Sequence, residues 1–150
     1  MHLTLITGPM FAGKSTLLLK QAMGKTLLVT HSLDTQKETH GGIVKPAMRV
    51  SSFKEIPSGY DTVLIDECQF FTSIEGIMCA PRVIVAGLNG DYQQKEFGIM
   101  SKLIPMADKI VHLVARCACG KDAPFTKRTS THLGSICPEA DYVPSCRQCL

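Results

Sequence analysis

The segment Gly8-Pro9-Met10-Phe11-Ala12-Gly13-Lys14-Ser15 has the residue types and spacing needed to hold a chain of phosphates. It fits the pattern G-x-x-x-x-G-K-[ST] at every position. In such a loop the backbone N–H groups and the start of the next helix attract phosphate oxygens. Lys14 places a cation near the transferring phosphate, and the Ser15 hydroxyl is a ligand for Mg²⁺. The pattern therefore predicts a loop that binds a nucleoside triphosphate.

Two carboxylates, Asp66 and Glu67, follow the apolar run of residues 62–65. If that run is a strand beside the first one, its carboxyl end faces the phosphates, where ligands bind in open α/β sheets. Asp66 is then placed to hold the magnesium shell, and Glu67 to accept a proton from an attacking hydroxyl or water. The alternative is a solvated acidic turn. These features alone do not separate a kinase from an ATPase that performs mechanical work.

Most of the seven cysteines crowd into the last part of the chain. Cys146-x-x-Cys149 has the spacing of half a tetrahedral zinc site, and Cys117-x-Cys119 supplies a second pair, with Cys137 as a substitute ligand. A redox pair or free buried cysteines are the rival interpretations. The odd count and the absence of a secretory leader disfavour a disulfide framework. We expect a structural zinc ion that stabilises a segment too small for its own core.

The elements that must position these groups follow from the alternation of apolar and polar segments. We expect buried strands at residues 3–7, 26–30, 62–65, 82–86 and 109–115. We expect helices at residues 14–23, 70–80 and 97–107, and a polar loop at residues 32–46. Strands that alternate with helices, each strand almost wholly apolar, predict a parallel sheet of P-loop NTPase type flanked by helices.

Composition bounds the remaining possibilities. The chain has 150 residues, of which 45% are hydrophobic and 19% charged, and a net charge of +3. These values predict a folded chain. After Arg116 the chain becomes rich in Cys, Pro, Gly, Ser and Thr, so we expect an α/β region at residues 1–115 and a small cysteine-rich region at residues 116–150. Basic residues are scattered, so we expect no nucleic-acid partner. With no targeting or membrane-spanning segment, we expect a cytoplasmic protein without a membrane partner.

Five motifs in this order resemble the type II thymidine kinases. They are residues 8–16, 66–71, 87–93, 125–128, and Tyr142 followed by residues 146–149. The resemblance implies transfer of the γ-phosphate of ATP to the 5′-hydroxyl of thymidine or deoxyuridine, which serves nucleotide salvage for DNA synthesis. Glu67 would be the general base, and Lys14 and Mg²⁺ would neutralise phosphate charge. It also implies a zinc-stapled cover over the nucleoside and a homotetramer.

The resemblance further assigns binding residues. The ATP and magnesium site would include the loop as far as Thr16, together with Asp34, Asp66 and Gln69. The nucleoside pocket would be lined by Met10, Phe70, Leu88, Tyr92, Phe97, Thr126 and Tyr142, with the backbone of Leu133, Gly134, Ser135, Ile136 and Cys137 bonded to the base. Without the resemblance, aromatic residues that follow strands would be interpreted as core.

The chain departs from the family pattern in two places that bear on function. One residue instead of two separates Cys117 from Cys119, which tightens the bite of that pair. Gln36 stands where the family carries a basic residue, and Lys37 is a possible replacement. The five histidines lack partners at ligand spacing, so we expect surface or core roles for them.

Two other functions compete with a nucleoside kinase. One is a P-loop ATPase, and the other is an inactive kinase relic that acts as a binding module. A motor needs coupling elements for which a chain of 150 residues leaves no room. A relic would be expected to have lost Lys14 or Glu67, and both are present.

Overall fold

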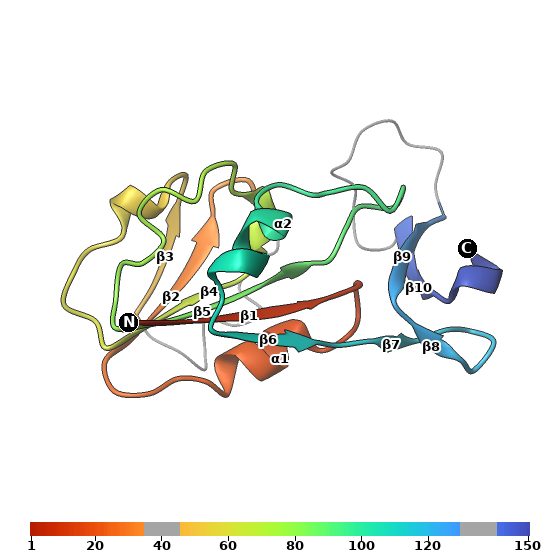
Figure 1. Cartoon of the computed structure of the whole chain (residues 1–150), viewed down its shortest axis with the longest axis horizontal. Helices are drawn as coiled ribbons and strands as arrows, with labels where there is room; N and C mark the ends of the chain where they lie inside the picture. Colours follow the sequence, from red (N-terminus) through yellow and green to blue (C-terminus); the bar gives the residue numbers. More distant parts are fainter. Residues whose placement is uncertain (35–45, 130–140) are drawn as a thin grey trace.

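A parallel sheet of six strands forms the centre of the structure, which is a computed structural model describing residues 1–34, 46–129 and 141–150 (Figure 1). The strand order is β3-β2-β4-β5-β1-β6, and every neighbouring pair is parallel. The strands are β1 (His2–Gly8), β2 (Thr26–His31), β3 (Ala47–Val50), β4 (Thr62–Ile65), β5 (Arg82–Leu88) and β6 (Lys109–His112). The α/β class predicted from the alternating apolar segments is confirmed.

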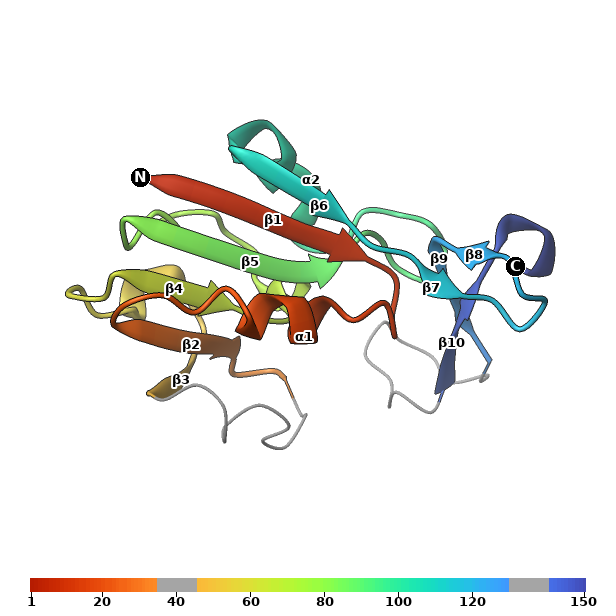
Figure 2. The same cartoon turned by 90° about the horizontal axis from the view of Figure 1, so that it is seen from below.

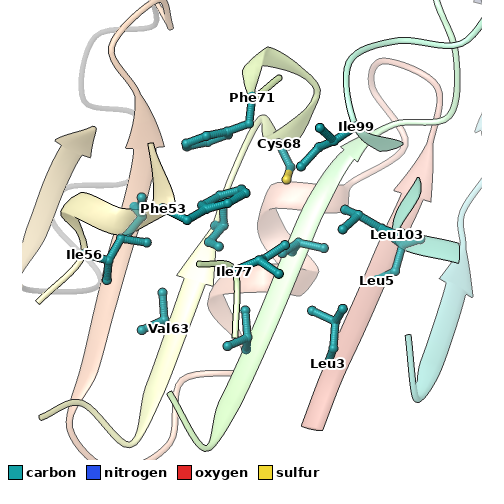
Figure 3. Packing of buried hydrophobic residues seen from close by; sticks show 14 of the residues in the cluster. Leu3, Leu5, Phe53, Ile56, Val63, Cys68, Phe71, Ile77, Ile99 and Leu103 are labelled. Atoms are coloured by element: carbon teal, nitrogen blue, oxygen red, sulfur yellow. The ribbon is translucent and has the colours of Figure 1, made fainter. Parts of the chain in front are cut away.

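The inner strands are apolar on both sides because both faces of the sheet are covered. On one face Phe53, Phe71 and Ile77 pack against the alternate side chains of the strands, including Leu5 and Val63 (Figure 3). Burial of each such side chain contributes about 1.5–3 kcal/mol, which makes this face the main core.

The opposite face is covered by α1 (Lys14–Leu19), a helix of six residues. Its Leu18 and Leu19 pack against Leu28, Leu64 and Ile84 of the sheet. The packing fixes the start of α1 over the middle of the sheet, directly after the glycine-containing loop.

The helices are shorter than the sequence predicts. The helix expected at residues 14–23 ends at Leu19, and the one expected at 97–107 is α2 (Met100–Leu103) followed by the 3₁₀ turn η3 (Ile104–Met106). Pro105 near the start of η3 and Gly98, which has φ of +56°, limit that helix on both sides. A further turn, η1 (Phe53–Glu55), is closed by a capping box between Ser52 and Glu55.

The helix predicted at residues 70–80 is wrong. Only the 3₁₀ turn η2 (Cys68–Phe70) forms there, and Phe71 then adopts extended backbone angles. Gly76 has φ of +84°, which breaks helical continuity in the same segment. The irregular chain still points Phe71 and Ile77 into the core, so it satisfies the apolar spacing that suggested a helix.

The sheet differs from the prediction at three strands. β4 does not lie beside β1, because β5 is inserted between them. The edge strand β3 was not predicted, because it follows a polar stretch that was interpreted as a loop. Residues 35–45 of that stretch are not among the described residues. The strand expected at 109–115 divides into β6 and a separate strand in the small C-terminal region.

The described part of that C-terminal region forms two small antiparallel ladders. β7 (Ala115–Arg116) pairs with β8 (Asp122–Ala123), and β9 (Phe125–Arg128) pairs with β10 (Tyr142–Ser145), before the turn η5 (Arg147–Cys149). Figure 2 shows these ladders beyond the carboxyl ends of β1 and β6, on the side where the glycine-containing loop lies. Within the described ranges, the helices are too short to span a bilayer.

Candidate phosphate and nucleoside site

The loop between β1 and α1 has the wrapped backbone that phosphate binding requires. Phe11 and Gly13 adopt left-handed angles, with φ of 63° and 84°. A side chain at Gly8 would place its Cβ 2.4 Å from the carbonyl oxygen of Leu113, so only glycine fits there. Lys14 is buried beneath the loop, and its Nζ donates to the Pro9 carbonyl oxygen at 2.5 Å. The side chain that should bind phosphate therefore points into the space that the loop encloses.

Ser15 and Asp66 form a direct pair at the carboxyl edge of the sheet. The Ser15 hydroxyl donates to Asp66 Oδ2 at 2.8 Å, and the Glu67 N–H donates to Asp66 Oδ1 at 2.9 Å. The two oxygen-bearing side chains meet although β5 separates β4 from β1, because α1 begins over the middle of the sheet. Hydroxyl and carboxylate oxygens are hard ligands that suit Mg²⁺, so this pair fits a magnesium site.

Glu67 combines backbone strain with an altered proton affinity. It has φ of 50° and ψ of 47°, a left-handed conformation that is uncommon for a residue with a side chain. Burial raises the pKa of its carboxyl to about 7, the negative charge of Asp66 adds to the rise, and a hydrogen bond from Gln69 and the charge of Lys14 oppose it. A carboxylate with this pKa can take up a proton near neutral pH.

The charges around Glu67 also act on Lys14. Burial lowers the pKa of the Lys14 ammonium, while Glu67 and Asp66 raise it in partial compensation. Asp34, which lies close enough to influence the pKa of Glu67, is buried after β2. Arg49 donates from Nη1 to the Asp34 carbonyl oxygen at 2.5 Å, so β3 contributes a cation beside this position. Arg49 lies on the strand that sequence analysis did not predict.

Gln69 connects Glu67 to the end of β5. Its Nε2 donates to Glu67 Oε2 at 2.5 Å, and its Oε1 accepts from the Leu88 N–H at 3.1 Å. Only 3% of its surface is exposed. The side chain therefore has both ends of its amide engaged within the site.

The predicted nucleoside residues divide into two groups. Phe70, Tyr92 and Phe97 are half-buried at the carboxyl edge of the sheet, in contrast to the fully buried core rings of Phe53 and Phe71. The Phe70 and Phe97 rings stand edge to face, with centroids 6.4 Å apart. Partial exposure of these rings is what an open pocket requires, and a core role would bury them.

The second group joins the loop to the C-terminal ladders. The Met10 N–H donates to Thr126 Oγ1 at 3.0 Å, and Thr126 is buried in β9. Tyr142 is buried opposite Arg128 in the β9–β10 ladder, and the Arg128 guanidinium lies 4.9 Å from the centroid of the Tyr92 ring. These contacts bring β9 and β10 against the phosphate loop.

A cavity of about 110 Å³ lies beside this junction. It is lined by Asn89, Gly90, Asp91, Gln94, Phe125 and Thr126. Only Thr126 among these was predicted as a binding residue, and the others stand within or next to motifs that the sequence does contain. The predicted base-binding loop, residues 133–137, lies outside the described residues, as do Gln36 and Lys37.

His31 is the buried member of the described histidines. Its ring stands edge to face with Phe71 at 4.7 Å, and its Nδ1 accepts from the Leu33 N–H at 2.9 Å. Burial lowers its pKa, a change that hydrogen bonding to the Ser51 backbone and the charges of Asp34 and Glu55 partly oppose. His31 therefore has a core role, whereas His2 and His112 are exposed.

Four cysteines converge in the C-terminal region. The sulfurs of Cys117, Cys119, Cys146 and Cys149 all lie within 4.8 Å of one another, and those of Cys119 and Cys146 are 3.6 Å apart. Sulfurs around a tetrahedral zinc ion would be separated by about 3.8 Å, so the cluster fits zinc. Backbone N–H groups of Cys119 and Cys146 lower the pKa of the Cys117 thiol to about 6, which favours the thiolate form that binds metal.

The one-residue spacing of the first pair is accommodated by a tight hairpin between β7 and β8. The Cys117 N–H donates to the Lys121 carbonyl oxygen, and the Gly120 N–H donates to the Cys117 carbonyl oxygen, both at 2.9 Å. Gly120 has φ of 89°, which this turn needs. The hairpin turns both sulfurs toward Cys146 and Cys149. Cys137, the substitute ligand, lies outside the described residues.

Comparison with known proteins gives one consistent result. The family model described as thymidine kinase matches residues 1–150. The chain is 35% identical over 171 residues to "Thymidine kinase a" of Arabidopsis thaliana, covering 95% of this chain and 72% of the relative. It is 35% identical over 177 residues to the thymidine kinase of Amsacta moorei entomopoxvirus, covering 99% and 97%. It is 34% identical over 169 residues to "Thymidine kinase, cytosolic" of Homo sapiens, covering 99% and 72%.

These alignments are longer than the 150 residues of this chain, so the relatives carry inserted segments that it lacks. The match over the whole length outweighs these deletions: the chain belongs to the thymidine kinase family.

Proposed function

We propose that this protein transfers the γ-phosphate of ATP to the 5′-hydroxyl of thymidine or deoxyuridine. The observation that carries the proposal is the position of Glu67. Its carboxylate is half-buried directly beside the Ser15–Asp66 pair and buried Lys14, where a phosphate donor and a proton acceptor are both needed.

The phosphate loop holds the donor. Its backbone N–H groups and the Lys14 ammonium bind phosphate oxygens, and Lys14 offsets the charge that develops during transfer. Ser15 and Asp66 would hold Mg²⁺, which would withdraw charge from the phosphate oxygens. Asp34 completes the acidic side of this site. Little covalent chemistry remains for the protein, because alignment and electrostatics dominate phosphoryl transfer.

Glu67 acts on the acceptor. The 5′-hydroxyl oxygen attacks the γ-phosphorus, and the bond from that phosphorus to the β–γ bridging oxygen breaks. The hydroxyl proton passes to Glu67, so the products are a nucleoside monophosphate and ADP. A pKa of about 7 leaves a useful fraction of Glu67 ionised and gives the base enough proton affinity for this step.

We propose that the acceptor nucleoside binds beside Phe70 and Phe97. Leu88, Tyr92 and Met10 complete the walls of its pocket, and Thr126 and Tyr142 approach from β9 and β10. The half-buried state of the aromatic rings supports this assignment. The base would be bonded by the backbone of residues 133–137.

We further propose that residues 116–150 form a separate cover, stapled by zinc at Cys117, Cys119, Cys146 and Cys149. The described part of this region buries few apolar side chains, so the metal would provide folding free energy that a core would otherwise supply. A homotetramer and a cytoplasmic location are proposed from family membership and from the human relative.

A nucleoside-dependence assay separates the kinase from the alternative ATPase. Protein is incubated with γ-labelled ATP and, in turn, with thymidine, deoxyuridine, deoxycytidine, deoxyadenosine or no nucleoside. We expect labelled monophosphate with thymidine and deoxyuridine. Release of labelled phosphate at one rate in all samples would instead identify an ATPase and refute the proposal.

A further inference from the structure

Gln69 occupies a position between the two halves of the proposed reaction. It lies in η2, two residues after Glu67, and reaches across to Leu88, the last residue of β5. Its side-chain amide bonds Glu67 at one end and the backbone of Leu88 at the other. Leu88 lines the proposed nucleoside pocket, so the Gln69 amide connects Glu67, the proposed general base, to the pocket wall that would hold the acceptor nucleoside.

The orientation of this amide is fixed by chemistry. A backbone N–H is only a donor, so the atom that faces Leu88 at 3.1 Å must be the carbonyl oxygen of the amide. The NH₂ group must then face Glu67 Oε2, which lies 2.5 Å away. A donor at that position restricts rotation of the carboxylate and selects which of its oxygens remains for the substrate hydroxyl.

The surroundings of Gln69 leave it little freedom. A Cβ at Gly87 would lie 3.0 Å from Gln69 Oε1 and 2.5 Å from Met100 Sδ. A Cβ at Gly98 would lie 2.0 Å from the Gln69 carbonyl oxygen. Two glycines therefore allow β5 and the segment before α2 to close tightly on Gln69, and burial of a side chain in one rotamer is the usual support for a preorganised site.

We propose that Gln69 is a positioning residue that clamps the Glu67 carboxylate to the Leu88 backbone and so aims the base at the acceptor hydroxyl. This rests on the proposed function, in which Glu67 is the base. This role differs from that of an ATP ligand, because the hydrogen bonds of the Gln69 amide go to Glu67, the general base, and to the backbone of Leu88 in the proposed nucleoside pocket.

The test replaces Gln69 with methionine, which keeps the length of the side chain and removes both polar ends. Misalignment of a reacting group by about 1 Å costs on the order of 100-fold in rate, so we expect kcat of Gln69→Met to fall about 10- to 100-fold. We expect KM for ATP and thymidine to change by about twofold or less, because ground-state binding is retained. Gln21→Met is the matched control, since both ends of the Gln21 amide also form hydrogen bonds but the residue lies just after the C-terminal end of α1, away from Glu67.

Gln69→Asn guards against a folding defect. The shorter amide can still satisfy the Leu88 N–H but cannot also reach Glu67, so it should show the same loss of kcat with an unchanged melting temperature. Full kcat in this variant would overturn the proposal. A raised KM for ATP at constant kcat would also overturn it, because that pattern identifies a phosphate ligand.

A double-mutant cycle distinguishes this inference from the proposed function. In a Glu67→Gln background there is no base to aim, so Gln69→Met should leave the residual rate unchanged. If the same factor is lost in that background, Gln69 does not act through Glu67. If Glu67→Gln itself retains full activity, the proposed function fails, whatever Gln69 does.

Discussion

At the scale of single residues, the site is defined by carboxylates packed around one buried lysine. Asp66 accepts hydrogen bonds from the Ser15 hydroxyl and from the Glu67 backbone N–H, so its oxygens have set directions. Glu67 is held by Gln69 and by a left-handed backbone. The sequence predicted Asp66 and Glu67 from their place after a strand, but it could not indicate that Gln69 joins Glu67 to Leu88, because the contact with Leu88 depends on β5 being the neighbour of β4.

Replacement of Asp66 by asparagine should weaken metal binding specifically. Asparagine keeps one oxygen acceptor and the size of the side chain, but it removes the charge that attracts Mg²⁺. We expect the magnesium concentration needed for half-maximal activity to rise about 10-fold or more, since the loss of a charged contact costs about 1.5–3 kcal/mol. The measurement is initial rate against magnesium concentration. An unchanged magnesium requirement would remove Asp66 from the metal site.

His31 gives the molecule a predictable acid sensitivity. Burial lowers its pKa below the unfolded value of 6.5, so the folded state favours the neutral ring. The contribution of the neutral His31 ring to the free energy of unfolding is fully present above pH 6.5. It is lost as the pH falls through that value toward the folded pKa, because the unfolded chain then takes up a proton that the folded chain does not.

We therefore expect the free energy of unfolding to fall below pH 6.5, with a slope from this group of at most about 1.4 kcal/mol per pH unit. His31→Asn keeps a polar side chain without an ionisable ring and should flatten the slope. Urea denaturation between pH 5 and 8 measures it. Identical slopes in the two proteins would show that His31 does not titrate in this way.

At the scale of elements, the phosphate loop was predictable from sequence, whereas the lengths of the helices and the irregular backbone of residues 70–80 were not. The G-x-x-x-x-G-K-[ST] pattern predicts the conformation of the loop, and the local sequence predicts the strand β1 before it and the start of the helix α1 after it. Residues 70–80 have apolar spacing that a helix would satisfy, yet an irregular chain buries the same side chains. Periodicity reports which residues face the core, and it does not identify the backbone that carries them when a segment is short.

The irregular segment after η2 should be as important to stability as a helix would be. Ile77 is 2% exposed and packs in the main core, so Ile77→Ala leaves a cavity. We expect a loss of about 2–5 kcal/mol in the free energy of unfolding. Ile104→Ala, at a site that is 55% exposed, should cost less than about 0.5 kcal/mol. Equal losses measured by chemical denaturation would contradict the assigned packing.

At the scale of the whole molecule, the C-terminal region with the four clustered cysteines is joined to the phosphate loop by hydrogen bonds. Thr126 accepts from Met10, and the Asn89 side-chain amide donates to the Pro124 carbonyl oxygen at 2.9 Å. The sequence predicted the four ligands but could not show that the shortened Cys117–Cys119 spacing still brings the sulfurs together, because this depends on the geometry of one hairpin.

Loss of zinc should therefore impair nucleoside binding more than ATP binding. Cys146→Ser removes one ligand and should raise KM for thymidine about 10-fold or more, in line with the effect of disturbing a structural metal site. Cys79→Ser, outside the cluster, is the control. Metal analysis should find about one zinc per chain in the control. Full zinc content and normal thymidine KM in Cys146→Ser would exclude the proposed staple.

Single-turnover transfer with Glu67→Gln tests the central claim most directly. Excess enzyme is mixed with γ-labelled ATP, magnesium and thymidine, and labelled thymidine monophosphate is followed by rapid quench. The unmodified enzyme should convert the label in one fast phase. Glu67→Gln should bind both substrates normally but transfer about 100-fold or more slowly, because the proton acceptor is lost. Equal transfer rates in the two proteins would contradict the assignment of Glu67 as the base.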